Sequence, residues 1–101
     1  MSERRATHPL VTKIDDLRLS LDVPMEAMAI ACGVAKVTYY GWLRGVSHPT
    51  PMNQKQLIIG ARILMTAAKC GDLPVPKEFG LPAKDHKTRI IELVTRYADA
   101  V

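Results

Sequence analysis

Apolar residues recur along this chain every three or four positions, and no segment alternates convincingly between apolar and polar with period two. A spacing of three and four residues is typical of helices that bury one face. The pattern predicts five helices, at about 12–21, 24–32, 35–44, 53–70 and 83–98. Gly33, Gly45 and Gly71 follow three of them, and glycine readily adopts the left-handed conformation that ends a helix. We therefore expect an all-α fold.

The segments between these helices divide the chain into four parts. Residues 1–11 are expected to be a flexible polar arm, in which Arg4 and Arg5 either touch a polyanionic partner or are simply solvated. Residues 12–71 form the main helical domain, whose first helix is expected to begin at Thr12. Residues 71–82 hold three prolines and two glycines, so 72–82 is interpreted as an extended connector. A C-terminal helix follows within 83–101.

The net charge of +4 is unevenly distributed. Residues 1–71 carry nine Lys or Arg against five Asp or Glu, whereas residues 72–101 carry five of each. The whole positive excess therefore lies in the main helical domain. A basic surface suits a polyanion such as nucleic acid, although charge alone does not identify the partner.

Several residue types argue against catalysis or a cofactor. Cys32 and Cys70 lie neither in a CxxC pair nor near a histidine at metal-ligand spacing, and both are expected to be reduced, buried thiols. His8, His48 and His86 are scattered, and His86 is expected at the surface. Neither a triad spacing nor a glycine-rich phosphate loop is present. The polar N-terminus and short apolar runs predict a cytoplasmic protein that is not an enzyme and holds no metal or cofactor.

The segment from Pro24 to Gly45 has the spacing that a helix-turn-helix needs. Two short helices that cross closely require a small residue in the first, and Ala29 is there. A sharp turn requires a residue that tolerates positive φ, and Gly33 follows four positions later. Val34 can then anchor the turn in the core, and the second helix has large side chains that face inward. These side chains are those of Tyr39 and Trp42.

This segment resembles the helix-turn-helix of the Cro and phage-repressor superfamily, often called XRE-like. The positions that match the pattern of that family are Ala29, Gly33, Val34, Trp42 and Gly45. Two positions depart from it. Met25 replaces a glutamine that commonly holds a DNA phosphate, and Tyr39 replaces isoleucine or valine. With flanking helices the resemblance covers about residues 12–71, and it implies a helix-turn-helix DNA-binding domain with a recognition helix at about 35–44.

The resemblance implies that the recognition helix enters the major groove with its N-terminal end toward the bases. Lys36 then matches a frequent base reader, Val37 could touch a thymine methyl group, and Thr38 could bond a base edge or a phosphate. Gly41 would let the helix sit close to the groove, and Arg44 matches a phosphate contact. His48 in the following loop is a further candidate for phosphate. The full set of expected DNA-binding residues is Ala35, Lys36, Val37, Thr38, Tyr40, Gly41, Arg44 and Ser47.

One copy of this motif should bind DNA weakly, because Lys36 and Arg44 are the only basic residues between Asp22 and Thr50. Members of this family compensate for weak binding by forming a homodimer. The two recognition helices of the homodimer enter successive major grooves of an inverted-repeat operator. The expected dimerisation surface is the apolar stripe of the last helix. It consists of Ile90, Leu93, Val94 and Tyr97. The alternative is that this helix folds back and completes the core of its own domain.

The residues and the resemblance together predict a sequence-specific, double-stranded DNA-binding transcriptional regulator, of the repressor type found in phages and bacteria. The expected compartment is the cytoplasm of a bacterial or phage-infected host cell. The alternative is a protein-interaction module on the same scaffold, which would bind a toxin, a polymerase subunit or a host regulator. The feature that separates the two is the trio Lys36, Val37 and Thr38, which a pure protein binder would not need.

Overall fold

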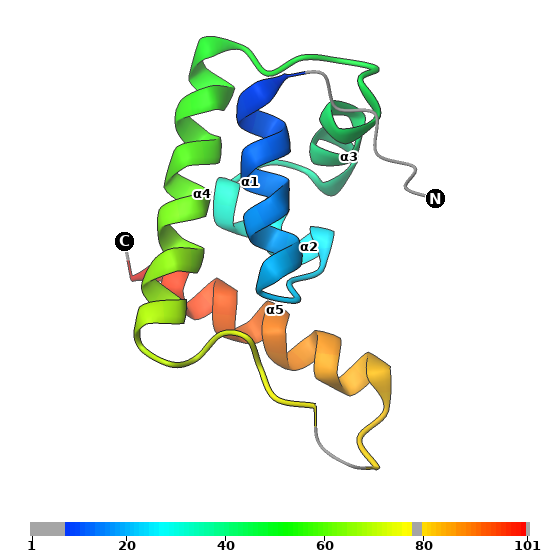
Figure 1. Ribbon diagram of the computed structural model, residues 1–101, viewed down its shortest axis with the longest axis vertical. Coiled ribbons are helices and arrows are strands. Elements are labelled where there is room, and N and C mark those ends of the chain that lie inside the picture. The colour runs from blue at the N-terminus through cyan, green and yellow to red at the C-terminus, as the bar shows by residue number, and fades with distance from the viewer. Residues whose placement is uncertain (1–7, 78–79, 101) are drawn as a thin grey trace.

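Five helices make up the part of the chain that the computed structural model describes, residues 8–77 and 80–100 (Figure 1). Those residues contain no strand, which confirms the all-α prediction. The helices are α1 (Pro9–Ser20), α2 (Met25–Cys32), α3 (Lys36–Arg44), α4 (Pro51–Lys69) and α5 (Ala83–Asp99).

Helix α1 begins three residues earlier than predicted, because His8 and Pro9 supply its start. The His8 ring accepts a hydrogen bond from the Leu10 N–H at 3.2 Å, and Pro9 occupies the first turn. The expected start of this helix at Thr12 is therefore wrong. The predicted arm 1–11 is also wrong at its end, since Val11 is fully buried in α1. Arg4 and Arg5 lie outside the described residues.

Helix α4 also begins earlier than predicted, at Pro51. The Thr50 side chain accepts a hydrogen bond from the Asn53 N–H at 3.2 Å, and the Asn53 side chain accepts one from the Thr50 N–H at 3.2 Å. This reciprocal capping box satisfies two backbone donors that would otherwise lack a partner.

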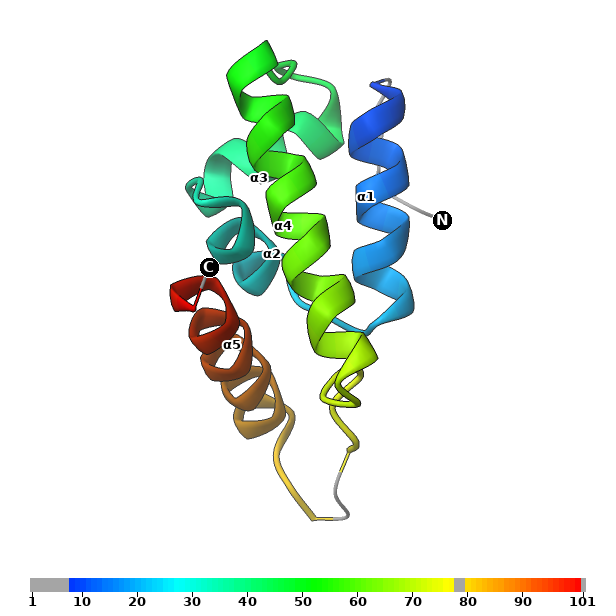
Figure 2. The same ribbon diagram turned by 90° about the vertical axis from the view of Figure 1, so that its left-hand side faces the viewer.

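Helices α1 and α4 lie side by side and run in the same direction, while α2 and α3 pack behind them (Figures 1 and 2). Helices α2 and α4 approach each other closely at Gly60. A Cβ on Gly60 would lie 3.1 Å from the Cys32 backbone nitrogen and would overlap the Cys32 sulfur. Glycine at this position therefore lets the two backbones approach closely.

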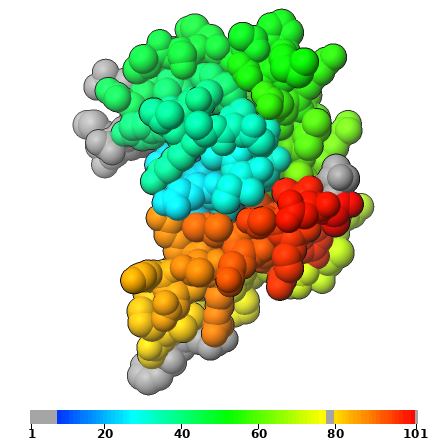
Figure 3. All heavy atoms as spheres, turned by 180° about the vertical axis from the view of Figure 1, so that it is seen from behind, coloured from blue at the N-terminus to red at the C-terminus, as the bar shows by residue number. Residues whose placement is uncertain are grey.

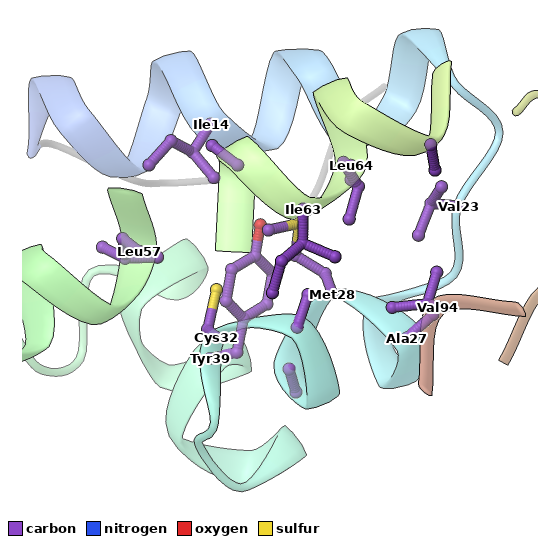
Figure 4. Close-up of a cluster of buried hydrophobic side chains, with 14 of the residues drawn as sticks. Ile14, Val23, Ala27, Met28, Cys32, Tyr39, Leu57, Ile63, Leu64 and Val94 are labelled. Carbon is purple, nitrogen blue, oxygen red and sulfur yellow. The ribbon is translucent and has the colours of Figure 1, made fainter. Parts of the chain in front are cut away.

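The core fills the space between these helices (Figure 4). All five helices contribute fully buried side chains, which include Tyr39, Met28, Leu57, Leu64, Ile90, Val11 and Val94. Trp42 is buried as predicted, and Met25 is half-buried against this core. The core therefore joins the α2–α3 region to α1, α4 and α5.

Helix α5 packs across α2 and the end of α4, and Figure 3 shows it directly against α2. Ile90, Leu93 and Val94 are buried in the core of their own chain, and Tyr97 is half-buried. The expectation that this stripe forms a dimer surface is therefore wrong for this fold, because the side chains already contact their own domain. The alternative, a helix that completes the core, is what the structure shows.

Two further expectations are corrected around α5. His86 is buried rather than on the surface, and its Nε2 lies 2.9 Å from the Val75 carbonyl oxygen in the connector. Cys70 is exposed at the end of α4, whereas Cys32 is buried as expected. The connector is therefore tied to α5 by the imidazole, and only one of the two thiols is protected by the core.

Candidate nucleic-acid interface

Helices α2 and α3 are joined by the three residues 33–35, and we refer to residues 25–44 as the α2–α3 unit. Gly33 has φ of 72°, which is the left-handed conformation expected of it. The Val34 N–H donates to the Ala29 carbonyl at 3.0 Å, so the turn closes back on α2. Val34 is half-buried against the core. These features match the roles predicted for Gly33 and Val34.

The inner side of α3 is fixed to α1 by a buried polar network. The Tyr39 hydroxyl donates to Asp15 Oδ1 at 2.8 Å, and both side chains are at most 1% exposed. The Arg18 guanidinium donates to the same carboxylate, with Nε 2.6 Å from Oδ1, and to the Val23 carbonyl at 3.0 Å. Burial, and then the charge of Asp15, raise the pKa of the Tyr39 hydroxyl above its ordinary value. Tyr39 is therefore held as a neutral donor inside the protein.

The outer side of α3 carries the predicted DNA-binding residues. Lys36, Val37, Tyr40 and Arg44 are exposed, and Val37 is 76% exposed. The Arg44 guanidinium lies over the Tyr40 ring, 5.5 Å from its centroid, which is within the range of a cation–π contact. The side chains of Lys36, Val37 and Arg44 thus point away from the core, while Tyr39, on the opposite side, points into it.

The remaining predicted residues lie at the two ends of α3. Ala35 is the exposed residue that precedes the helix, and Thr38 is half-buried in its first turn. Gly41 accepts hydrogen bonds from the Val46 and Ser47 N–H groups, and a Cβ on it would lie 3.1 Å from Ser47 Oγ. Gly41 therefore makes room for the loop that follows α3, a role that the sequence did not suggest. Ser47 itself is exposed beside it.

Glu26 in the first turn of α2 was not singled out from the sequence, yet it contacts Lys36, one of the predicted DNA-binding residues. Its Oε1 accepts hydrogen bonds from Lys87 Nζ at 2.6 Å and Lys36 Nζ at 3.1 Å. The hydrogen bonds from Lys87 and then Lys36 lower the pKa of Glu26 below its ordinary value of 4.5. One carboxylate therefore links the start of α3 to α5. Lys36 and Lys87 lie 10 and 61 positions after Glu26, so the local sequence pattern does not indicate these contacts.

No protein-family model, curated protein or solved structure matches the chain. Across residues 8–77 and 80–100, no group of three or more His, Cys, Asp or Glu side chains could hold a metal ion. None of the helices in this described part combines the length and the apolar character needed to cross a membrane. The arrangement of α3 is thus the main observation on which a function can be argued.

Proposed function

We propose that the α2–α3 unit is a DNA-binding helix-turn-helix and that the chain is a sequence-specific transcriptional regulator of the repressor type. One observation carries the proposal. Helix α3 has one side locked into the core through Tyr39 and Trp42, and its opposite side leaves Lys36, Val37 and Arg44 exposed to a partner. A rigidly mounted helix with polar, basic and small apolar groups on its outer side suits the major groove.

The residues along α3 divide into base readers and phosphate contacts. Lys36, Val37 and Thr38 in the first turn are proposed to meet base edges, with Ala35 and Gly41 allowing close approach. Arg44 at the other end is proposed to bind phosphate, and its stacking on Tyr40 restricts the positions that the guanidinium samples. Ser47 in the loop is a further phosphate contact.

Lys36 has to leave Glu26 before it can reach a base. The ammonium and the carboxylate are both partly exposed, so breaking this pair costs little in water. Glu26 retains Lys87 as a partner at 2.6 Å when Lys36 moves away. The carboxylate is therefore not left unpaired, and Lys36 can exchange one anionic partner for another.

Two copies on an inverted repeat remain part of the proposal. One α3 supplies two cations, Lys36 and Arg44, and each neutralised phosphate contributes a limited, salt-dependent gain. The paired surface is not the Ile90 stripe, because that stripe is in the core of its own chain. Occupancy of both half-sites can be measured directly by sedimentation of the complex with DNA.

The test is selection of bound duplexes from a random pool, followed by titration of the selected site at several salt concentrations. We expect an inverted repeat and an affinity that falls as salt rises. Lys36→Ala should relax base preference by about 1–3 kcal/mol per lost contact, and Arg44→Ala should weaken all sequences about equally. Lys69→Ala is the control variant, because it removes one positive charge at the far end of α4. No enriched sequence, together with an affinity that does not depend on salt, would refute the proposal.

The second candidate is a protein-interaction module, and the exposed apolar groups near α3 favour it. Val37 and Val46 are 76% and 72% exposed, so both apolar side chains are accessible to an apolar surface of a protein partner. In that case the outer side of α3 would contact a toxin, a polymerase subunit or a host regulator. Val37→Ser would then weaken binding to the protein partner, whereas selection from DNA would enrich no site.

A further inference from the structure

Helix α4 carries a row of cations on its solvent side. Lys55, Arg62 and Lys69 are exposed and lie seven residues apart, which places them on one side of the helix at intervals of about 10 Å. The helix contains no acidic residue. None of the three cations forms an ion pair with a described residue. Figure 2 shows α4 running uncovered along the front of the molecule.

Apolar groups flank this row. Ile58, Ile59 and Met65 are between 40% and 46% exposed. Beside them a hollow of about 400 Å³ opens between α4 and α5, and its lining includes Ile59, Ile63, Tyr97 and Ala100. Arg62 lines this hollow and also a shallower one on the other side, next to Met65. We call the hollow and the row of cations together the α4–α5 groove.

The charge on the groove decides which occupant suits it. A second copy that paired through the same surface would bring two rows of cations together, and like charges in contact are unfavourable. A nucleic acid would satisfy the cations but would leave the isoleucine and methionine side chains facing a charged backbone. A helix with apolar residues on one side and acidic residues along the adjoining edge satisfies both features.

We propose that the α4–α5 groove binds an amphipathic, acidic helix of a partner protein. Apolar side chains of that helix enter the hollow beside Ile59 and Tyr97, and carboxylates spaced by one or two turns pair with Lys55, Arg62 and Lys69. In Figure 1, α4 lies at the opposite side of the molecule from α3. The partner can therefore bind while the outer side of α3 is occupied.

The experiment uses two synthetic peptides of 18 residues, each held helical by a side-chain staple. Both carry leucines on one face; one has glutamates along the edge and the other has lysines at the same positions. Fluorescence anisotropy with the full chain should show binding of the acidic peptide and at least tenfold weaker binding of the basic one. Added salt should weaken the acidic complex.

Variants of the chain locate the site. Arg62→Glu should weaken the acidic peptide at least tenfold and improve binding of the basic one. Lys84→Glu makes the same charge change near the far end of α5 and should leave both affinities unaltered. Circular dichroism checks that the variants fold, and Lys69→Glu replaces Arg62→Glu if that variant does not.

Three results would overturn the proposal. The first is that both peptides bind equally well or that neither binds. The second is that the chain binds vesicles with anionic phospholipid, or duplex DNA, through Arg62 while the acidic peptide does not bind. The third is that sedimentation shows a dimer which Arg62→Glu dissociates, since the groove would then hold a second copy.

Discussion

Replacing Tyr39 by phenylalanine removes one hydroxyl group and leaves the ring in place. The ring is fully buried and forms an edge-to-face pair with Trp42, with 6.3 Å between the two centroids. The substitution therefore creates no cavity of consequence. It removes the hydrogen bond that the hydroxyl donates to Asp15 at 2.8 Å and leaves that buried carboxylate with one donor fewer.

The size of the effect follows from the charge of the acceptor. A hydrogen bond to a charged group contributes about 1.5–3 kcal/mol, more than a bond between neutral groups. Arg18 remains bonded to Asp15 at 2.6 Å, so the carboxylate keeps its counter-ion. We therefore expect a loss of about 2 kcal/mol in the free energy of unfolding at neutral pH. For a domain of this size that corresponds to a fall of about 8–16 °C in the melting temperature.

Urea unfolding followed by circular dichroism measures this loss, provided that the slope of the free energy of unfolding against urea concentration is the same for the wild-type protein and Tyr39→Phe. Tyr40→Phe is the control, because it removes the same atom from the next residue of α3, which is exposed and makes no side-chain hydrogen bond with a described residue. It should change stability by less than about 0.5 kcal/mol. If Tyr39→Phe proves as stable as Tyr40→Phe, the argument that the network holds α3 to α1 is wrong.

The stability difference between the wild-type protein and Tyr39→Phe should depend on pH in a defined direction. The pKa of Tyr39 is raised from its ordinary value of 10.0 by burial and by Asp15. A raised pKa means that the folded state disfavours the phenolate, so this contribution to stability is complete below pH 10 and is lost as the pH rises above it. Phenylalanine cannot ionise. The difference in stability between the wild-type protein and Tyr39→Phe should therefore shrink above pH 10.

Three further substitutions or reactions test other contacts. Gly60→Ala should destabilise the fold by about 1–3 kcal/mol in urea unfolding, because the added methyl group would overlap the sulfur of Cys32; an unchanged midpoint would contradict the close approach of α2 and α4. Cys70 should react with iodoacetamide in the folded protein, whereas Cys32, whose pKa is raised to about 12 by burial, should react only after unfolding, as mass spectrometry of each peptide can determine. Glu26→Gln should bind the selected DNA severalfold more tightly at low salt, since it frees Lys36 and removes a negative charge; weaker binding would mean that the carboxylate positions the lysine for DNA.

Local signals were enough to place the helices. Glycine at 33 and 45 adopts positive φ at the end of α2 and α3, as expected where a residue with a side chain would be strained. The start of α1 lies before the first residue of the apolar pattern, because its first turn depends on the His8 side chain and Pro9, which belong to a polar segment. The start of α4 at Pro51 was missed because proline is common in loops as well as in the first turn of a helix.

The surface against which α5 packs could not be predicted from the sequence. An apolar stripe shows that a helix buries one face, but not whether the partner is its own domain or a second copy. The same limit applies to the contacts that hold α3 in place. Tyr39 was correctly placed inside, yet its partner Asp15 lies 24 residues earlier, and nothing in the local pattern links a tyrosine in one helix to an aspartate in another.

The packing of α5 on α2 also determines when the α2–α3 unit can be completed during synthesis. Lys87 is made 61 residues after Glu26, its partner in α2. Until residues 83–99 have left the ribosome, the side of α2 that they cover is exposed to solvent. A nascent chain that ends near residue 71 would contain every residue of α3 but would lack part of the core on which α3 is mounted. Binding through α3 is thus expected to appear late in synthesis, after the connector has turned α5 back onto the domain.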